Sequence, residues 1–383
     1  MPTTLLPAPA LLGKAERVAT RLVFFVIGLS GAAWAPLVPF AKSRNQLSEG
    51  QLGLLLLCLG IGSILAMPVA GALAARHGCR RVILTAMGLV CLALPLLALA
   101  APLGLLAPAL FVFGVGLGSV DCVINMQAVL VERASSRTLM SGFHGLFSVG
   151  GMVGAGSMIA LLSAGVSPVA ATGLLVVVSV SVLLYAAPHL LAYGSSSEGP
   201  AFALPRGVVL FIGLLCFILF LTEGSVLDWS AVFLSTERAV NPAWAGLGYT
   251  VFSLAMLLGR FTGDVLVRRL GGSAMLGLGG LLAALGLTLT VLVPSWQVGL
   301  IGYALVGAGC ANMVPVLFSA VGRQRVMPAH LAIPAISTIG YAGILAGPAL
   351  IGFVVQATTF TTAFLGLAAL LVGVAASSRK LSV

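Results

Sequence analysis

The stretch GVVLFIGLLCFILFLTEGSVLDWSAVFLS, residues 207–235, is apolar along nearly its whole length and yet carries two acids, Glu223 and Asp228. A helix needs about 20 apolar residues to cross the hydrocarbon of a bilayer, so this run is long enough to span it. A charge at the bilayer centre costs roughly 2.5 to 3.5 kcal/mol on insertion scales. The stretch therefore predicts a membrane-spanning helix in which the two acids have a functional role.

The composition extends this prediction to the whole chain. Of the 383 residues, 60% are hydrophobic and 7% are charged, whereas a soluble domain carries about 25% charge. Backbone polar groups in lipid must be satisfied internally, which leaves helices or closed barrels, and the long unbroken apolar runs are not barrel strands. We expect an all-α integral membrane protein with twelve transmembrane helices, near residues 18–41, 51–75, 80–101, 103–131, 137–163, 166–189, 207–235, 242–267, 272–294, 296–322, 328–357 and 359–377. The division between the third and fourth spans rests on Pro102 and Gly104.

The net charge of +10 comes from basic residues scattered at the ends of these spans. A nucleic-acid partner would require a basic stripe with aromatic residues, so we expect none. Cytoplasmic loops of membrane proteins are rich in Lys and Arg. If the amino terminus lies inside, the Lys and Arg residues in outer loops are only Lys42, Arg44 and Arg238. We expect a multi-pass protein of the inner (plasma) membrane with both termini cytoplasmic. The amino-terminal LLPAPALLGKAER shows no convincing cleavage site, so no removed signal peptide is expected.

The cysteines and histidines show no metal-ligand or redox spacing. The six cysteines lie almost entirely within spans, where they serve as small apolar fillers. No nucleophile constellation and no nucleotide-binding loop is present either. We therefore expect no metal, no cofactor and no enzymatic activity.

A Ser-, Gly- and Pro-rich segment, AYGSSSEGPAFALPRG (192–207), separates the sixth apolar span from the seventh. It predicts an amino-terminal six-helix bundle (1–191), a cytoplasmic linker (192–206) and a carboxy-terminal six-helix bundle (207–383). The halves are weakly similar: residues 34–53 align with 229–248, and 71–78 with 263–271. An internal duplication places a binding site between the halves, near the midplane.

The loops GALAARHGCRR (71–81) and GRFTGDVLVRRLG (259–271) carry a resemblance to the major facilitator superfamily over essentially the whole chain. This resemblance implies two pseudo-symmetric bundles and transport by alternating access. Ala75 stands where the superfamily usually has Asp. Arg260 and Asp264 lie four residues apart on one helix face and form either a local ion pair or a gate contact that breaks during transport. The residues expected to contribute to gating are Arg76, Arg80, Arg81, Arg260 and Asp264.

The fourth span, within GVGLGSVDCVINMQAVLVER (114–133), resembles that of the fucose-permease-like branch, with Gly116, Gly118, Asp121 and Asn125 in the matching places. The resemblance implies that Asp121 carries the coupled proton, although the acid of that branch is a Glu. A carboxyl group in an enclosed cavity can bind a proton from one side and release it to the other; the alternative is a structural acid. The branch's acid in the first span falls at Ala35 here.

Glu223, in the outer half of the seventh span, is the second candidate for proton coupling. Asp228 lies about 140° around an ideal helix from it, so the two acids share a face only if Gly224 breaks the helix. The candidates for substrate binding, each with packing as the alternative, are Trp34, Asn125, Gln127, Asp228, Trp229 and Asn312.

These observations favour a monomeric, proton-coupled secondary transporter of a small polar solute, such as a sugar. Two alternatives stay open: an efflux antiporter for drugs or metabolites with the same fold, and a membrane sensor that binds without transporting. The low aromatic content, 7%, disfavours the first alternative, and the short tail after the last span disfavours the second. The expected partners are the solute, protons and the lipid bilayer.

Overall fold

The computed structural model describes residues 13–46, 49–99, 103–194 and 203–380. Residues 1–12, which include most of the segment considered above for a signal peptide, lie outside these ranges, as do Pro102 and the centre of the linker. Within them the chain is helical and contains no strand. Twelve helical segments are long and apolar enough to cross a membrane, which confirms the predicted all-α architecture.

The amino-terminal half contains α1 (Lys14–Ala32), η1 (Ala35–Leu37), α2 (Val38–Asn45), α3 (Glu49–His77), α4 (Cys79–Ala98), α5 (Leu103–Ser135), α6 (Met140–Ser163), α7 (Pro168–Ala186) and η2 (Ala187–His189). The carboxy-terminal half contains α8 (Val208–Glu237), α9 (Pro242–Ala245), α10 (Leu247–Leu270), α11 (Gly272–Leu292), α12 (Trp296–Cys310), α13 (Met313–Arg323), α14 (Ala329–Ala357), α15 (Phe360–Ser377) and η3 (Ser378–Lys380). The break between α4 and α5 falls where the third and fourth spans were divided.

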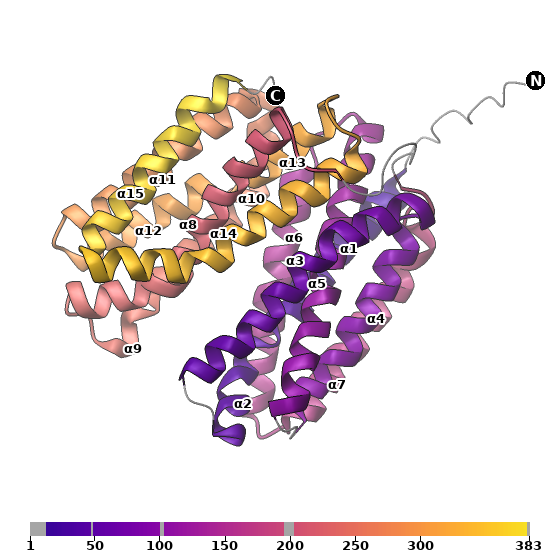
Figure 1. The fold of residues 1–383 in the computed structure, drawn as a ribbon, viewed down its shortest axis with the longest axis horizontal. Helices are drawn as coiled ribbons and strands as arrows, with labels where there is room; N and C mark the ends of the chain where they lie inside the picture. The colour runs from indigo at the N-terminus through magenta and orange to yellow at the C-terminus, as the bar shows by residue number, and fades with distance from the viewer. Residues whose placement is uncertain (1–12, 47–48, 100–102, 195–202, 381–383) are drawn as a thin grey trace, which may run out of the picture.

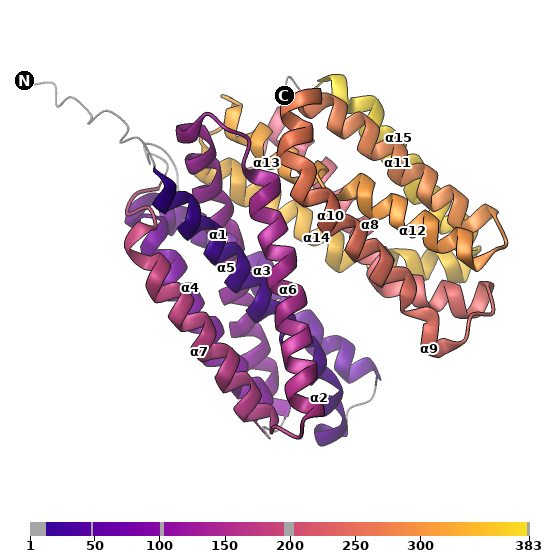
Figure 2. The same cartoon turned by 180° about the vertical axis from the view of Figure 1, so that it is seen from behind.

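The two halves form separate bundles that lean against each other (Figure 1). Both views show the bundles converging at the end that holds the two termini and diverging toward α2 and α9 (Figure 2). We call these the termini end and the far end. Across the boundary, α3 packs against α14 and α6 packs against α10, so these two helix pairs hold the halves together.

Glycines set the closest helix contacts within each half. A Cβ atom on Gly343 of α14 would lie 2.3 Å from the Phe217 carbonyl oxygen of α8. In the other half, a Cβ on Gly28 of α1 would lie 2.2 Å from the Phe147 carbonyl oxygen of α6. Lipid provides no hydrophobic force between helices, so close backbone approach at small residues supplies much of the association.

Near the far end of each half, an arginine donates hydrogen bonds to carbonyls at the end of a neighbouring helix. Arg44 donates from Nη1 to the Ala98 carbonyl at 2.8 Å, at the end of α4. Arg238 donates from Nη2 to the Thr290 and Val291 carbonyls at 3.1 and 2.8 Å, at the end of α11. The last carbonyls of a helix have no intrahelical donor, and a cation there also interacts favourably with the helix dipole. The repeated device agrees with the similarity between residues 34–53 and 229–248.

Two spans are interrupted in the described part of the chain, whereas the seventh span, in which Gly224 could permit a break, is continuous. The first span divides into α1, η1 and α2, and the tenth divides at Ala311 and Asn312 between α12 and α13. In contrast, α8 runs unbroken through Gly224, whose Cβ position lies 3.0 Å from Cγ1 of Ile344. Gly224 therefore provides room for α14, and Glu223 and Asp228 stay on different faces of a regular helix.

We expect Gly343→Ala to destabilise the fold, because the added methyl group meets a backbone carbonyl that cannot move aside without shifting α8. Overpacking of this kind costs about 1 to 3 kcal/mol, so the apparent Tm of the purified protein should fall by several degrees. Gly373→Ala is the matched control, because nothing lies within 4 Å of its Cβ position. Equal Tm values for the two variants would contradict the packing account.

Candidate functional site

Asp121 on α5 and Glu223 on α8 lie at similar depths in opposite halves. Asp121 is 14 residues from the end of α5 at Ser135, and Glu223 is 15 residues from the start of α8 at Val208. At 1.5 Å per residue, both lie roughly 21 to 23 Å from the termini end of their helices. Both side chains are half-buried, so each keeps some accessible surface.

Each acid faces an electrostatic partner within the protein. Asn125 donates from Nδ2 to the Asp121 backbone carbonyl at 2.9 Å and to its Oδ1 at 3.4 Å. Across the boundary between the halves, Asp121 interacts electrostatically with Tyr341 of α14. Glu223 interacts in the same way with Arg260 of α10. These partners show that neither acid is turned toward lipid.

Several buried polar side-chain atoms in the same helices have no hydrogen-bond partner. An unsatisfied buried donor or acceptor costs about 1 to 3 kcal/mol, and native structures contain few of them. Three of the atoms below lie on α5 and α8, the helices that carry the two acids, and the others lie on α6, on α14 and at the breaks of the first and tenth spans. Each of them is a group that a polar ligand could satisfy. The atoms are Trp34 Nε1, Asn125 Oδ1, His144 Nε2, Glu223 Oε1, Trp229 Nε1, Asn312 Oδ1, Ser337 Oγ and Thr338 Oγ1.

The break in the tenth span provides an acceptor for Arg260. Pro315 follows Ala311 by four residues and has no N–H, so the Ala311 carbonyl lacks its usual helical donor. Arg260 Nε donates to this carbonyl instead, at 3.4 Å. Its Nη1 donates to Oγ of Ser148 on α6, which joins the two halves. Sequence reasoning missed Ser148, because a lone serine in an apolar helix gives no signal.

The amino terminus of α6 is held by two carboxylates. Its first backbone N–H groups have no intrahelical acceptor and attract negative charge. Glu132 of α5 accepts from the Leu139 and Met140 amides at 2.8 and 2.9 Å. Asp264 of α10 accepts from the Ser141 and Gly142 amides, both at 3.1 Å. One carboxylate comes from the same half as α6 and the other from the opposite half.

Further contacts tie this region to α13 and to the end of α10. Ser319 of α13 donates to Glu132 Oε1. Thr138 donates from Oγ1 to the Asp264 carbonyl at 2.9 Å and accepts from Arg268 Nη1 at 3.3 Å. We call the contacts of Glu132 and Asp264 with α6, together with these three hydrogen bonds, the termini-end latch. Sequence reasoning missed Glu132, which lies eight residues before α6 begins at Met140.

Arg260 and Asp264 do not form an ion pair with each other in the described part of the chain. Each instead contacts α6 of the other half, four residues apart on the same face of α10. A Cβ on Gly263 would lie 2.6 Å from Cβ of Ser141, so this glycine allows α10 to approach α6. Of the two interpretations given above, the geometry favours the gate contact.

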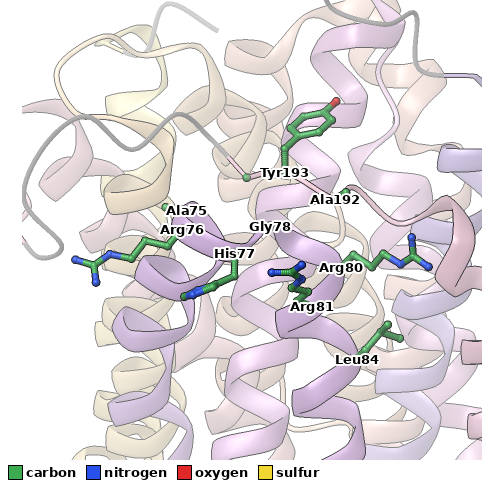
Figure 3. Close-up of a pocket in the computed structure, with 10 residues that line it drawn as sticks. Ala75, Arg76, His77, Gly78, Arg80, Arg81, Leu84, Ala192 and Tyr193 are labelled. Atoms are coloured by element: carbon green, nitrogen blue, oxygen red, sulfur yellow. The ribbon is translucent and has the colours of Figure 1, made fainter.

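Arg76, Arg80 and Arg81 gather elsewhere, around a cavity of about 700 Å³ at the start of the linker (Figure 3). Its wall is joined to the linker by hydrogen bonds from the Cys79 amide to the Tyr193 carbonyl at 3.3 Å and from the Arg80 amide to the Leu191 carbonyl at 2.8 Å. Every residue that lines it belongs to the amino-terminal half or to the first linker residues. A gating role for these arginines stays a prediction.

The expected substrate-binding residues fall into two groups. Trp34, Asn125 and Asn312 are buried and keep unpartnered polar atoms, and Asn312 donates from Nδ2 to the Gly259 carbonyl at 3.0 Å. Gln127 differs, because both ends of its amide are occupied within the amino-terminal half. Its Nε2 donates to Thr20 Oγ1 at 2.9 Å, and its Oε1 accepts from the Leu191 amide at 3.2 Å.

The two remaining candidates lie toward the far end. Asp228 is exposed on α8. Trp229 packs its ring edge-on against Phe360 of α15, with centroids 5.7 Å apart. A substrate-binding role for these residues stays a prediction, and the full hydrogen bonding of Gln127 and the exposure of Asp228 make these two the weakest candidates.

Comparison with known proteins places the chain in a family. Residues 22–241 match the family model described as Major Facilitator Superfamily. The chain is 54% identical over 371 residues to an uncharacterised MFS-type transporter of Yersinia pestis, covering 97% of each protein. The chain belongs to the major facilitator superfamily, a family of membrane transporters and not of enzymes.

Solved structures agree on the fold. The fucose:proton symporter FucP of E. coli superposes with a TM-score of 0.79 at 19% identity, covering 96% of this chain and 98% of that one. The human organic anion transporter MFSD10 superposes with a TM-score of 0.75 at 17% identity, covering 95% of this chain and 99% of that one.

We expect Asp264→Ala to weaken the termini-end latch, because the Ser141 and Gly142 amides lose their charged acceptor. A charge at a helix terminus contributes up to about 2 kcal/mol in partly buried geometries, so the open form should gain up to about 30-fold. Double electron–electron resonance between spin labels at Arg137 and Arg269, two exposed positions near the latch, should show a longer distance population. Glu237→Ala, at the far end of α8, should leave the distances unchanged. An unaltered distribution in Asp264→Ala would exclude the latch role.

Proposed function

We propose that this protein is a proton-coupled secondary transporter that moves a small polar solute across the inner membrane by alternating access. The observation that carries the proposal is the pair of mid-depth carboxyl groups, Asp121 and Glu223, on opposite halves and facing inward. A membrane protein keeps such charges rarely, and usually on an ion or substrate pathway.

The arrangement of the halves supports alternating access. The latch joins them at the termini end, while they diverge toward the far end (Figures 1 and 2). With both termini in the cytoplasm, as the distribution of Lys and Arg indicates, this is a form closed to the cytoplasm. Release of Asp264 from α6 is then one step of the change that opens the cytoplasmic side.

The acids supply the coupling. A carboxyl group that faces the space between two bundles is reached from each side in turn, so it can load a proton on one side and unload it on the other. One charge crossing 100 mV is worth about 2.3 kcal/mol, which is enough to drive accumulation of a solute. The unpartnered atoms of Trp34, Asn125 and Asn312 provide donors and acceptors for the polar groups of the solute.

We expect Asp121→Asn to abolish uptake driven by a pH gradient while leaving counterflow exchange of the same solute intact. The amide is nearly isosteric but cannot carry a proton, so only the coupled step is lost. The measurement uses proteoliposomes with an internal pH-sensitive dye and a panel of sugars, organic acids and other metabolites. Glu237→Gln, which removes an exposed carboxyl group, is the control. Undiminished accumulation by Asp121→Asn would remove Asp121 from the coupling role.

We expect Glu223→Gln to weaken the stabilisation of the protein by the solute that the wild type transports. A ligand present at 100 times its Kd adds about 2.7 kcal/mol to the free energy of unfolding, which is visible as a rise in Tm. Loss of a polar contact to Glu223 should shrink that rise. A full rise in the variant would place the solute away from Glu223.

A further inference from the structure

Arg260 is a charged side chain that is buried in the membrane-spanning helix α10. It lies on α10, ten residues from the end of that helix at Leu270, and is only 7% exposed. This places it roughly 15 Å from the termini end, nearer to that end than Asp121 and Glu223. A guanidinium group stays protonated in proteins, so the charge persists in every state.

The described surroundings do not neutralise this charge locally. No ion pair to Arg260 is found among the described residues, and its hydrogen-bond partners are a backbone carbonyl, that of Ala311, and a hydroxyl, that of Ser148. Glu223 interacts with it electrostatically, but from beyond ion-pair distance. Of the five N–H donors of a guanidinium, these two neutral oxygens engage only two.

A structural role alone does not require a cation here. The Ser148 hydroxyl and the Ala311 carbonyl each need one hydrogen-bond donor, and an uncharged N–H group can supply each of them. One helical turn away, Asp264 already joins α10 to α6 through two amides. A permanent charge at this depth is costly, so the charge itself needs a purpose.

The neighbouring groups suit an anion. The unpartnered Nε2 of His144 and the hydroxyl of Ser148 lie on the facing side of α6, and His144 also interacts electrostatically with Arg260. A guanidinium presents its donors as a planar fork that matches a carboxylate in bidentate geometry. The Ser148 hydroxyl already donates to the His144 carbonyl at 3.3 Å, so the groups left for a ligand are the remaining N–H donors of Arg260 and the His144 Nε2 beside them. These N–H donors match the two oxygens of a carboxylate.

We propose that Arg260 binds an anionic group, a carboxylate, on the transported solute. This inference rests on the proposed transport function and narrows its solute from any small polar molecule to an organic acid, such as a sugar acid or hydroxy acid. Glu223 is the internal competitor for the same cation, which places the carboxylate of the solute between Arg260 and the mid-depth acids.

The test compares matched pairs of probes on the purified wild-type protein at constant pH and ionic strength. Each pair joins an acid to its neutral counterpart: a hexuronate with its hexose, and a hydroxy acid with its amide. We expect at least one acid to raise Tm and its neutral partner to leave Tm unchanged. Arg260→Gln should lower the apparent affinity for that acid at least tenfold, and Arg260→Lys should restore part of it.

Arg238→Gln is the charge-matched control, because Arg238 holds the end of α11 at the far end and its loss should leave the preference for the acid unchanged. If Arg260→Gln does not fold, Arg260→Lys is compared with Arg238→Lys, and only the former should change the ratio of affinities for acid and amide. Stabilisation by neutral probes alone, stabilisation by no acid, or an acid preference that survives in Arg260→Gln would each overturn the proposal.

The outcomes separate this inference from the transport function on which it rests. Proton-driven uptake of a neutral solute into proteoliposomes would overturn the role of Arg260 and leave the proposed transport function in place. Acid binding that depends on Arg260, without uptake under any pH gradient, would support the role of Arg260 and contradict proton-coupled transport.

Discussion

Hydrocarbon offers no hydrogen bonds, and every polar group that enters it must find a partner inside the protein. This constraint explains where the chain places its few charges. Arg44 and Arg238 satisfy carbonyls at the ends of α4 and α11. Arg260 satisfies the carbonyl that Pro315 leaves open. Each of these three arginines donates to a carbonyl that lacks its usual helical donor, at a place where a helix ends or breaks.

In the transport cycle proposed above, the same constraint keeps the cost of opening the termini-end latch modest. Glu132 and α6 belong to the same half, so the Leu139 and Met140 amides keep their acceptor when the halves part. Only the Ser141 and Gly142 amides exchange Asp264 for water. A helix terminus that depended wholly on the opposite half would lose all its acceptors at once. Because two carboxylates share the α6 amides, the free-energy difference between closed and open forms stays within the range that ligand binding can shift.

The spans could be predicted because hydropathy is a local property, and all twelve lie where the apolar runs indicated. The inward position of Asp121 and Glu223 followed from the cost of their charges in lipid. The contacts of Arg260 with Ser148 and of Asp264 with α6 could not be predicted, because they join residues more than a hundred positions apart. Whether Gly224 breaks α8 could not be predicted for a related reason. A glycine permits either a kink or a close neighbour, and only the packing of Ile344 decides between them.

The two sides of the closed end are held by different forces. Between α10 and α6 the contact is charged, and it depends on Asp264. Between α3 and α14, the corresponding helices of the other side, a Cβ on Gly71 would lie 2.2 Å from Cγ of Pro334, so the contact is close apolar packing. The duplicated loop aligns Ala72 with Asp264, and Ala75 stands where the superfamily usually has Asp, so no carboxylate is available there. Charge–dipole contacts weaken with salt and with protonation, whereas apolar packing responds to neither. Solution conditions therefore act on closure mainly through the α6–α10 side.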